Sequence, residues 1–388
     1  MKDYQSNTIA LDAVVVSHND ADHFGGVWDL FSPDAAARAE LDAQNLTVER
    51  IFHAGLSWWR TPSGDRTLGP TADDAAGKSC YTQLLGNRQS VVDATNGNAA
   101  SPKLKGEWSE LWKAALGVRR KDGTPTPVQR VGHNTGDLPG FEPQPGRVRI
   151  RVLGPIESTV AGNPALRKYS GGDSKNTNGH SVLLRLDYGR TRILLTGDLN
   201  RVSQGAILQE YVGQRQELEA DVTKACHHGS DDVSYEFLQA IRAAVTVISS
   251  GDGEGHDHPR AAIVAASATT GFLKVEDDAI KSPLVYSTEI ARSLNVGVAS
   301  RLTRTAANGQ PIFDLSRDEL GSVTAEVKVT KAGALNPETR IRRLDRTPLV
   351  ADLVYGLVNV RTDGDRIVCA TRNESDATWN VKEIRSRF

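Results

Sequence analysis

Short apolar runs alternate with polar clusters along the first two thirds of the chain. Residues 10–16 include three consecutive valines and predict a buried strand, because short β-branched runs pack well in sheets. Residues 148–153 alternate between apolar and basic side chains, as a strand does. Residues 181–186 and 191–195 predict a hairpin, joined by the turn-forming segment 187–190.

Helical patterns are interleaved with these strands. A helix is expected to begin near Asp22, and the remaining elements expected here are a helix over 33–44, a strand over 47–53, a helix over 201–215, a strand over 221–226, a helix over 232–243 and a strand over 244–249. Such alternation is typical of α/β proteins.

Residues 54–146 interrupt this pattern and predict a helical insertion. The segment is rich in Gly, Pro, Ser and Asp, with helices expected at 81–94 and 105–118. It contains four tryptophans, namely Trp58, Trp59, Trp108 and Trp112. Packing within the insertion is the favoured role for them, since large aromatic side chains are mostly buried. The alternative is that loops of the insertion shape a substrate cleft.

The tail differs from the rest of the chain. Strands are expected at 327–329, 353–361 and 366–370. We therefore expect a domain over 1–280 and a β-rich C-terminal extension over 281–388, which either stands apart or adds strands to the first domain.

Composition narrows the class of protein. Of 388 residues, 39% are hydrophobic and 24% are charged, as in soluble globular proteins. No run of about 18 apolar residues occurs, so no membrane partner is expected, and the polar N-terminus favours a cytoplasmic location. The net charge of −2 argues against a protein that coats nucleic acid, but not against an enzyme that acts on it. Nothing in the sequence indicates the oligomeric state.

The strongest chemical signal directly follows the strand over 10–16. His18, Asp20, Asp22 and His23 place four potential metal ligands within six residues. Neutral imidazole and carboxylate suit Zn²⁺, Mn²⁺ and Fe²⁺. The alternative, that these residues cap or pack a helix, explains the cluster less well, because grouped carboxylates repel one another unless cations compensate them.

Three weaker signals follow other apolar strands. Asp198 closely follows the strand over 191–195, a position from which a carboxylate can bridge two metals. His227 and His228 are adjacent and can serve as ligand and general acid. Either His256 or His258 is expected to complete the second metal shell, and spacing does not decide between them.

Other residues are expected to lie outside the chemistry. Three histidines fall outside the clusters and are predicted to be structural, namely His53, His133 and His180. The three cysteines, Cys80, Cys226 and Cys369, are far apart in sequence and form no CxxC pair. Any metal site must therefore use His and Asp.

Together these motifs resemble the metallo-β-lactamase superfamily. The segment 17–26, SHNDADHFGG, resembles its first motif and is most similar to the ComEC-type branch, the hydrolase domain of DNA-uptake competence proteins, in which the usual second His is an Asp. Segments 176–184, 195–198, 227–230 and 255–259 match later motifs of that branch in the same order. The resemblance covers about residues 10–265.

This resemblance implies an αββα sandwich with two divalent metal ions, Zn or Mn, at one edge. By position, His18 and Asp20 would bind one cation, and Asp22 and His23 the other. Asp198 would bridge them, and His227 or His228 would lie at the scissile group. His256 or His258 would close the second site. The expected catalytic residues are Asp22, His227 and His228.

The sequence departs from the superfamily pattern in three respects. Only 17 residues precede His18, so the N-terminal strands of the sandwich are expected to be missing. Leu153-Gly154-Pro155 stands where a further His ligand often follows the strand. The membrane-spanning part of competence proteins has no counterpart, so a role as an uptake channel is not implied.

The leading functional hypothesis is a metal-dependent phosphodiesterase or nuclease that acts on nucleic acid or on a small phosphodiester. Paired cations can activate water and stabilise the developing negative charge on the substrate. One alternative is an ester, lactone or thioester hydrolase of the same fold. The other is a non-catalytic module that binds metal or a partner.

Overall fold

The computed structural model describes residues 8–34, 45–95, 101–251, 258–289, 301–329, 338–343, 355–372 and 377–388. The chain is mixed α/β and divides into two compact units. The first comprises Met1–His227, Asp232–Arg242 and Ser386–Phe388, and the second comprises His228–Asp231 and Ala243–Arg385. The helix expected over 33–44 falls almost wholly outside the described residues. The division at residue 280 stays a prediction.

A parallel sheet in the first unit carries the strand before the main motif. Its order is β2 (Val14–Val16), β4 (Ile51–His53) and β9 (Val128–Arg130). A separate parallel pair joins β1 (Thr8–Leu11) to β3 (Asn45–Val48). The single strands expected over 10–16 and 47–53 are thus each divided, and the exposed Asp12 lies at the first break. Since a polar residue at this position faces solvent, the apolar run does not continue as one buried strand.

A second sheet in the first unit carries Asp198 just after one of its strands. Five strands pair in the order β10 (Gly136–Asp137), β11 (Arg149–Gly154), β14 (Leu183–Tyr188), β15 (Thr191–Leu195) and β16 (Val222–Lys224). The predicted hairpin is confirmed as β14 and β15. The predicted helix over 201–215 is shorter, because α6 (Arg201–Glu210) ends before Gly213, whose φ is +80°.

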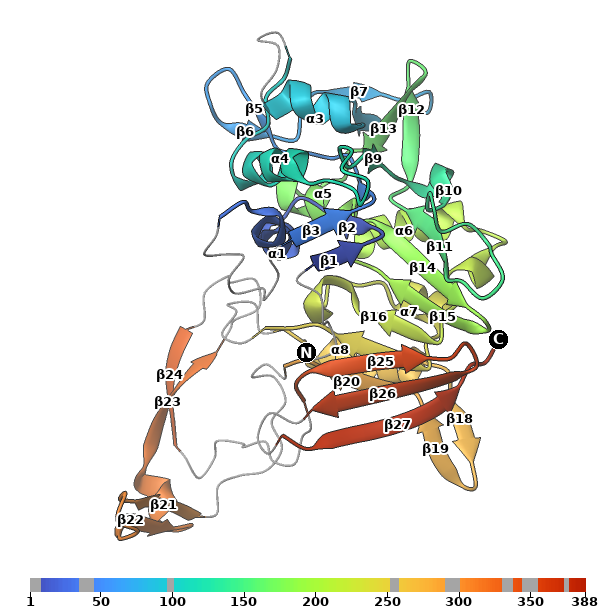
Figure 1. Ribbon diagram of the computed structural model, residues 1–388. Helices are drawn as coiled ribbons and strands as arrows, with labels where there is room; N and C mark the ends of the chain where they lie inside the picture. Colours follow the sequence, from blue (N-terminus) through green and yellow to red (C-terminus); the bar gives the residue numbers. More distant parts are fainter. Residues whose placement is uncertain are drawn as a thin grey trace. The chain divides into compact units, whose positions relative to one another are not determined.

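The two sheets pack against each other and against helices (Figure 1). Phe52 of β4 meets Val152 and Leu184 of the second sheet in one apolar cluster. Ile51 points to the opposite face, as strand alternation requires, and joins a larger cluster. That cluster includes residues of α1 (Ala21–Phe31), α3 (Arg88–Thr95) and α4 (Glu107–Gly117).

The insertion is partly helical and partly built of short strands. Trp108 and Trp112 of α4 are buried, with ring centroids 5.4 Å apart, so the predicted packing role of these two is confirmed. Tyr81 was expected to begin a helix, but it ends strand β8 (Ser79–Tyr81), and α3 begins only at Arg88. In one two-stranded sheet, β5 (Trp59–Arg60) pairs with β6 (Arg66–Thr67). A four-stranded sheet has the strand order β12 (Glu157–Val160), β13 (Asn163–Arg167), β8 and β7 (Thr71–Asp73).

Four shorter helical segments lie wholly within the described part of the first unit. They are η1 (His133–Thr135), α5 (Asp173–Gly179), η2 (Arg215–Glu217) and α7 (Tyr235–Ile241). The buried carboxylate of Asp221 anchors the last residues of the chain. It accepts hydrogen bonds from Arg192 N, Ser386 Oγ and Arg387 N, each at 3.0 Å.

The second unit is rich in strands. β17 (Val245–Ile248) pairs in parallel with β20 (Leu284–Ser287), and the rest of the unit consists of α8 (Ala261–Thr270), η4 (Glu319–Ser322) and antiparallel strands. These strands are β18 (Lys274–Glu276) with β19 (Ala279–Ser282), β21 (Arg301–Thr305) with β22 (Pro311–Ser316), β23 (Thr324–Val329) with β24 (Glu338–Arg343), and β25 (Val358–Thr362), β26 (Arg366–Arg372), β27 (Trp379–Arg385). The strands expected at 327–329 and 366–370 are confirmed. Within the described residues, no helix is both long and apolar enough to cross a bilayer.

Candidate metal centre

The first wall of the candidate site is the turn between β2 and α1. His18 is buried directly after the strand, and Asp20 is the N-cap residue of the helix. The Asp20 side chain makes no capping hydrogen bond, so the carboxylate does not serve the helix end in the usual way. Asp22 and His23 lie in the first helical turn. The turn thus carries all four side chains of the first motif.

The second wall is the segment after β15. Gly197 has a φ of +55°, and a Cβ built there would lie 2.6 Å from Ser181 Cβ. Only glycine fits this conformation and this spacing without strain. The close approach lets the Asp198 backbone N–H donate to Ser181 Oγ at 2.9 Å, and the Asp198 side chain is buried. Gly197 therefore sets the position of the Asp198 carboxylate.

The two walls bring acidic and imidazole groups together. His23 Nε2 lies 3.1 Å from Asp198 Oδ2 and 3.6 Å from Asp22 Oδ2. Each of these three residues can offer a ligand atom within 4.8 Å of the others. Residues about 175 positions apart in sequence thus form a cluster able to hold a metal ion. The group combines imidazole nitrogen with carboxylate oxygen, which suits Zn²⁺ or Mn²⁺.

The remaining predicted ligands of the first unit adjoin this cluster. The His18 and His23 rings have centroids 4.1 Å apart, and His18 Nε2 lies 3.9 Å from Asp20 Oδ2. His227 Nε2 lies 4.0 Å from Asp198 Oδ2. The structure therefore gathers all six predicted site residues that belong to the first unit.

Two serines that were not predicted orient the histidines. Ser17 Oγ lies 3.0 Å from His18 Nδ1 and 3.2 Å from His23 Nδ1, and Ser181 Oγ lies 3.2 Å from His18 Nδ1. In the tautomer that carries its proton on Nδ1, each imidazole donates to serine and leaves Nε2 as a lone-pair donor. Groups of this kind fix ring orientation in metal sites.

Burial shifts the pKa values of two residues of the site towards their uncharged forms. Desolvation, followed by the nearby His23, lowers the pKa of His18 to about 3, so that its imidazole is neutral. Desolvation raises the pKa of Asp20 to about 6, although Thr177 Oγ1 donates to it at 3.1 Å. A bound divalent cation would instead favour the charged form of this carboxylate.

One lysine and one amide also contact the site. Lys224 Nζ lies 3.6 Å from Asp198 Oδ1 and donates to the Gly197 carbonyl at 3.1 Å. Asn178 Nδ2 lies 3.4 Å from His227 Nε2. Neither was predicted from the sequence, although Asn178 falls within the matched segment 176–184. Lys224 precedes the His227-His228 motif by three residues, and this proximity was the available signal.

The structure describes the predicted histidines of the later motifs only in part. His227 and His228 both adopt left-handed backbone conformations, with φ of 46° and 51°, within the 3-10 turn η3 (Cys226–Gly229). His228 is the first residue of the second unit, and its Nδ1 lies 2.8 Å from the Ser249 carbonyl. The His258 carbonyl accepts from Ser250 Oγ at 2.6 Å. His256 lies outside the described residues, so the choice between His256 and His258 stays open.

The three other histidines make structural contacts. His53 Nδ1 accepts from Gly55 N, and His133 Nδ1 accepts from Glu157 N. His180 Nε2 donates to the Arg167 carbonyl. These bonds agree with the structural roles expected from the sequence.

Comparison with known proteins finds similarity to competence proteins over a short stretch. The chain is 32% identical over 88 residues to ComE operon protein 3 of Bacillus subtilis (strain 168), and this match covers 22% of this chain and 11% of that protein. It is 34% identical over 87 residues to competence protein ComA of Neisseria gonorrhoeae, and this match covers 22% of this chain and 12% of ComA. The match therefore spans about a ninth of each relative's length. No family model matches the chain.

Proposed function

We propose that this protein is a metal-dependent hydrolase of phosphodiester bonds with a dinuclear centre of the metallo-β-lactamase type. The observation that carries the proposal is the convergence of Asp22, His23 and Asp198 to within 4.8 Å of one another. His18, Asp20 and His227 adjoin them. The partial similarity to two competence proteins supports the same assignment.

The donor set fits divalent cations better than it fits a structural role. The His18 Nε2 atom is buried and has no hydrogen-bond partner among the described residues, which costs about 1–3 kcal/mol in a purely structural cluster. Three carboxylates of this region, Asp20, Asp22 and Asp198, also outnumber the lysines that the described residues place in an ion pair with them, since only Lys224 does so. Bound cations remove both costs.

Each side chain then has a defined task. His18 and Asp20 would hold one cation, Asp22 and His23 the other, and Asp198 would contact both. When bound, such cations supply Lewis acidity at the scissile group and acidify a water molecule. His227, with Asn178 beside its Nε2, would donate a proton to the leaving group. The resemblance also implies one of His256 and His258 as a ligand of the second cation. Nucleic acid or a small phosphodiester is the proposed substrate.

The test measures metal binding and hydrolysis in the same preparations. Purified protein should bind Mn²⁺ or Zn²⁺ in calorimetry and hydrolyse bis(p-nitrophenyl) phosphate. Asp198→Ala should abolish hydrolysis and lower metal affinity at least 100-fold, because the buried ligand is lost. The matched control is Asp73→Ala, an exposed aspartate on β7, which should match the parent protein. Tight metal binding with hydrolysis of esters or thioesters, but not of phosphodiesters, would contradict the proposed substrate class. A protein that binds no divalent metal would contradict the whole proposal.

A further inference from the structure

A pocket of about 340 Å³ opens beside Asp20, within the first unit. Asn19, Asp20 and Phe24 line one side of it, and the insertion lines the rest. Trp58 joins the two sides, since its Nε1 donates to the Asn19 carbonyl at 2.9 Å. Asp20 therefore belongs both to the candidate metal centre and to the pocket wall. An occupant of the pocket would therefore lie beside the candidate metal centre.

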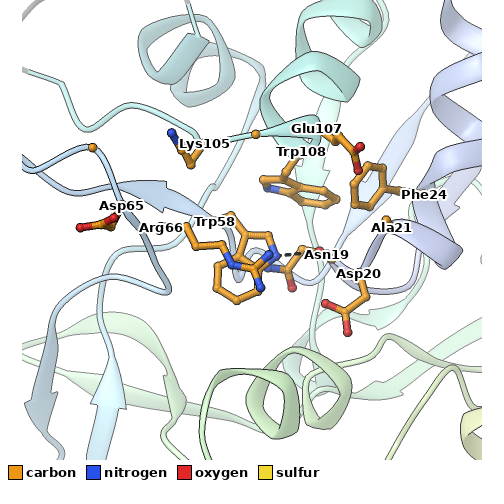
Figure 2. Close-up of a pocket in the computed structure, with 12 residues that line it drawn as sticks. Asn19, Asp20, Ala21, Phe24, Trp58, Asp65, Arg66, Lys105, Glu107 and Trp108 are labelled. Atoms are coloured by element: carbon orange, nitrogen blue, oxygen red, sulfur yellow. Dashed lines mark hydrogen bonds between the residues drawn. The ribbon is translucent and has the colours of Figure 1, made fainter. Parts of the chain in front are cut away.

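A preoriented cation lies across this pocket. The Arg66 guanidinium carbon lies 4.2 Å from the centroid of the Trp58 ring, and Figure 2 shows the Arg66 side chain lying over that ring. Stacking on an aromatic face restricts a long side chain at little cost and leaves the N–H groups of the guanidinium available. Lys105 supplies a second cation to the lining.

These two cations have no anionic partner in the described part of the chain. Neither Arg66 nor Lys105 forms an ion pair or a side-chain hydrogen bond with another described residue. Two carboxylates other than Asp20 line the pocket, those of Asp65 and Glu107. Asp65 accepts from Ser63 Oγ at 2.8 Å, and in Figure 2 its carboxylate is directed away from Arg66. The guanidinium is thus free to bind an anion from solution.

The lining also offers unused hydrogen-bonding groups. The Asn19 side chain is 1% exposed, and neither its amide nitrogen nor its oxygen has a partner among the described residues. Figure 2 places this amide between Trp58 and Asp20. A polar ligand in the pocket would use it, whereas an apolar acyl group would leave it unsatisfied. The walls therefore favour a polar occupant, and Arg66 and Lys105 offer a place for its anionic group beside the carboxylates of Asp20, Asp65 and Glu107.

We propose that this pocket is a phosphate subsite for a single nucleic-acid strand, in which Arg66 and Lys105 hold the phosphate next to the one at the metal centre. The inference rests on the proposed function and narrows its substrate class to a polymer with consecutive phosphates. The volume suits one nucleotide unit, since pockets for small ligands begin at about 300 Å³. Arginine held in a fixed orientation is the side chain best suited to bidentate phosphate recognition.

The test compares a substrate that has a neighbouring phosphate with one that has none. Arg66→Gln should lower kcat/KM for an oligothymidine about tenfold, as expected for one lost charge-assisted contact. It should leave kcat/KM for bis(p-nitrophenyl) phosphate within about twofold of the parent value. Arg66→Lys keeps the charge but loses the planar stacking, so its effect should be intermediate. Arg147→Gln is the control, because Arg147 is also exposed but lines a different pocket.

Binding gives a readout that does not need catalysis. The affinity for a fluorescein-labelled oligothymidine, measured by anisotropy at several KCl concentrations, should depend less steeply on salt in Arg66→Gln. The slope of log K against log[salt] should fall by about 0.7, the value for one single-strand phosphate contact. Equal losses on both substrates, or an unchanged salt slope, would overturn the subsite. Binding that depends on Arg66 without any hydrolysis would instead refute the proposed function and retain the subsite.

Discussion

Gly197 lets the site close, and replacing it with alanine tests this directly. Its φ of +55° costs an alanine about 1–2 kcal/mol. The new Cβ would also lie 2.6 Å from Ser181 Cβ and 2.8 Å from Ser181 Oγ, well inside the usual carbon–carbon contact of about 3.5–4.0 Å. Ser181 must therefore move away.

Movement of Ser181 has a cost that the structure allows us to estimate. Its Oγ accepts from Asp198 N and donates to the Asn178 carbonyl, each at 2.9 Å. Loss of two buried hydrogen bonds costs about 2 kcal/mol. Together with the backbone strain, Gly197→Ala should lower the free energy of unfolding by about 3–4 kcal/mol. Because Asp198 and His18 both contact Ser181, the affinity for Mn²⁺ should also fall about 10–100-fold.

The matched control is Gly213→Ala. Gly213 also has a positive φ, of +80°, but a Cβ there would meet nothing within 4 Å. This variant should lose only the backbone contribution of about 1–2 kcal/mol and keep its metal affinity. Urea unfolding of the metal-free proteins by circular dichroism and calorimetric titration with Mn²⁺ provide the two measurements. If the two alanine variants agreed within about 0.5 kcal/mol and bound metal equally well, the close packing of Gly197 on Ser181 would be refuted.

Three further predictions concern the orientation of His18 and His23, the pH dependence of stability and the contacts of the C-terminal residues. Ser17→Ala should lower Mn²⁺ affinity about 10–100-fold in calorimetry, because His18 and His23 lose their common partner, and an unchanged affinity would contradict the role of Ser17. Burial lowers the pKa of His53 to about 3, so the metal-free fold keeps His53 neutral. The unfolded chain takes up a proton at this residue below about pH 6.5. The contribution of His53 to the free energy of unfolding is therefore complete above that pH and falls by about 1.4 kcal/mol per pH unit as the pH drops towards 3. His53→Gln should reduce the pH slope of the unfolding free energy by about one proton, and an identical slope would count against a neutral buried His53. Asp221→Ala should destabilise the protein by about 2–4 kcal/mol, seen as a lower urea midpoint, since three hydrogen bonds are lost; a change below about 0.5 kcal/mol would show that the anchor contributes nothing.

The sequence predicted features that depend on neighbouring residues. The hairpin of β14 and β15 follows from two apolar runs around a turn, and the start of α1 follows from the polar cluster after β2. The same argument failed at Asp12, where an exposed polar residue interrupts the apolar run, and at Tyr81, whose strand pairs with the distant strand β13. Sheet partners are chosen by the whole fold, which local pattern does not contain.

The sequence indicated the residues of metal-binding type in the candidate site, but not the side chains that support them. Residues with metal-binding side chains are recognisable by type, and six of them meet in the first unit. The supporting groups have ordinary side chains, such as the hydroxyls of Ser17 and Ser181. Ser181 reaches His18 across 163 positions of sequence, so only the fold reveals the contact. The Arg66 side chain was overlooked for a different reason: it is close to Trp58 in sequence, but the sequence did not predict the short hairpin of β5 and β6 that stacks it on the ring.

The polar interior of this site links stability to metal binding. Among the described residues, the buried atoms His18 Nε2 and Asn178 Oδ1 have no hydrogen-bond partner, and each such atom costs the metal-free fold about 1–3 kcal/mol. A cation that binds the folded chain and not the unfolded one contributes RT ln(1 + [L]/Kd), about 2.7 kcal/mol at a metal concentration 100 times Kd. The gain should vanish in Asp198→Ala and persist in Arg66→Gln, because only the first variant removes a ligand. Stabilisation by Mn²⁺ therefore separates the metal centre from the pocket beside it without any measurement of catalysis.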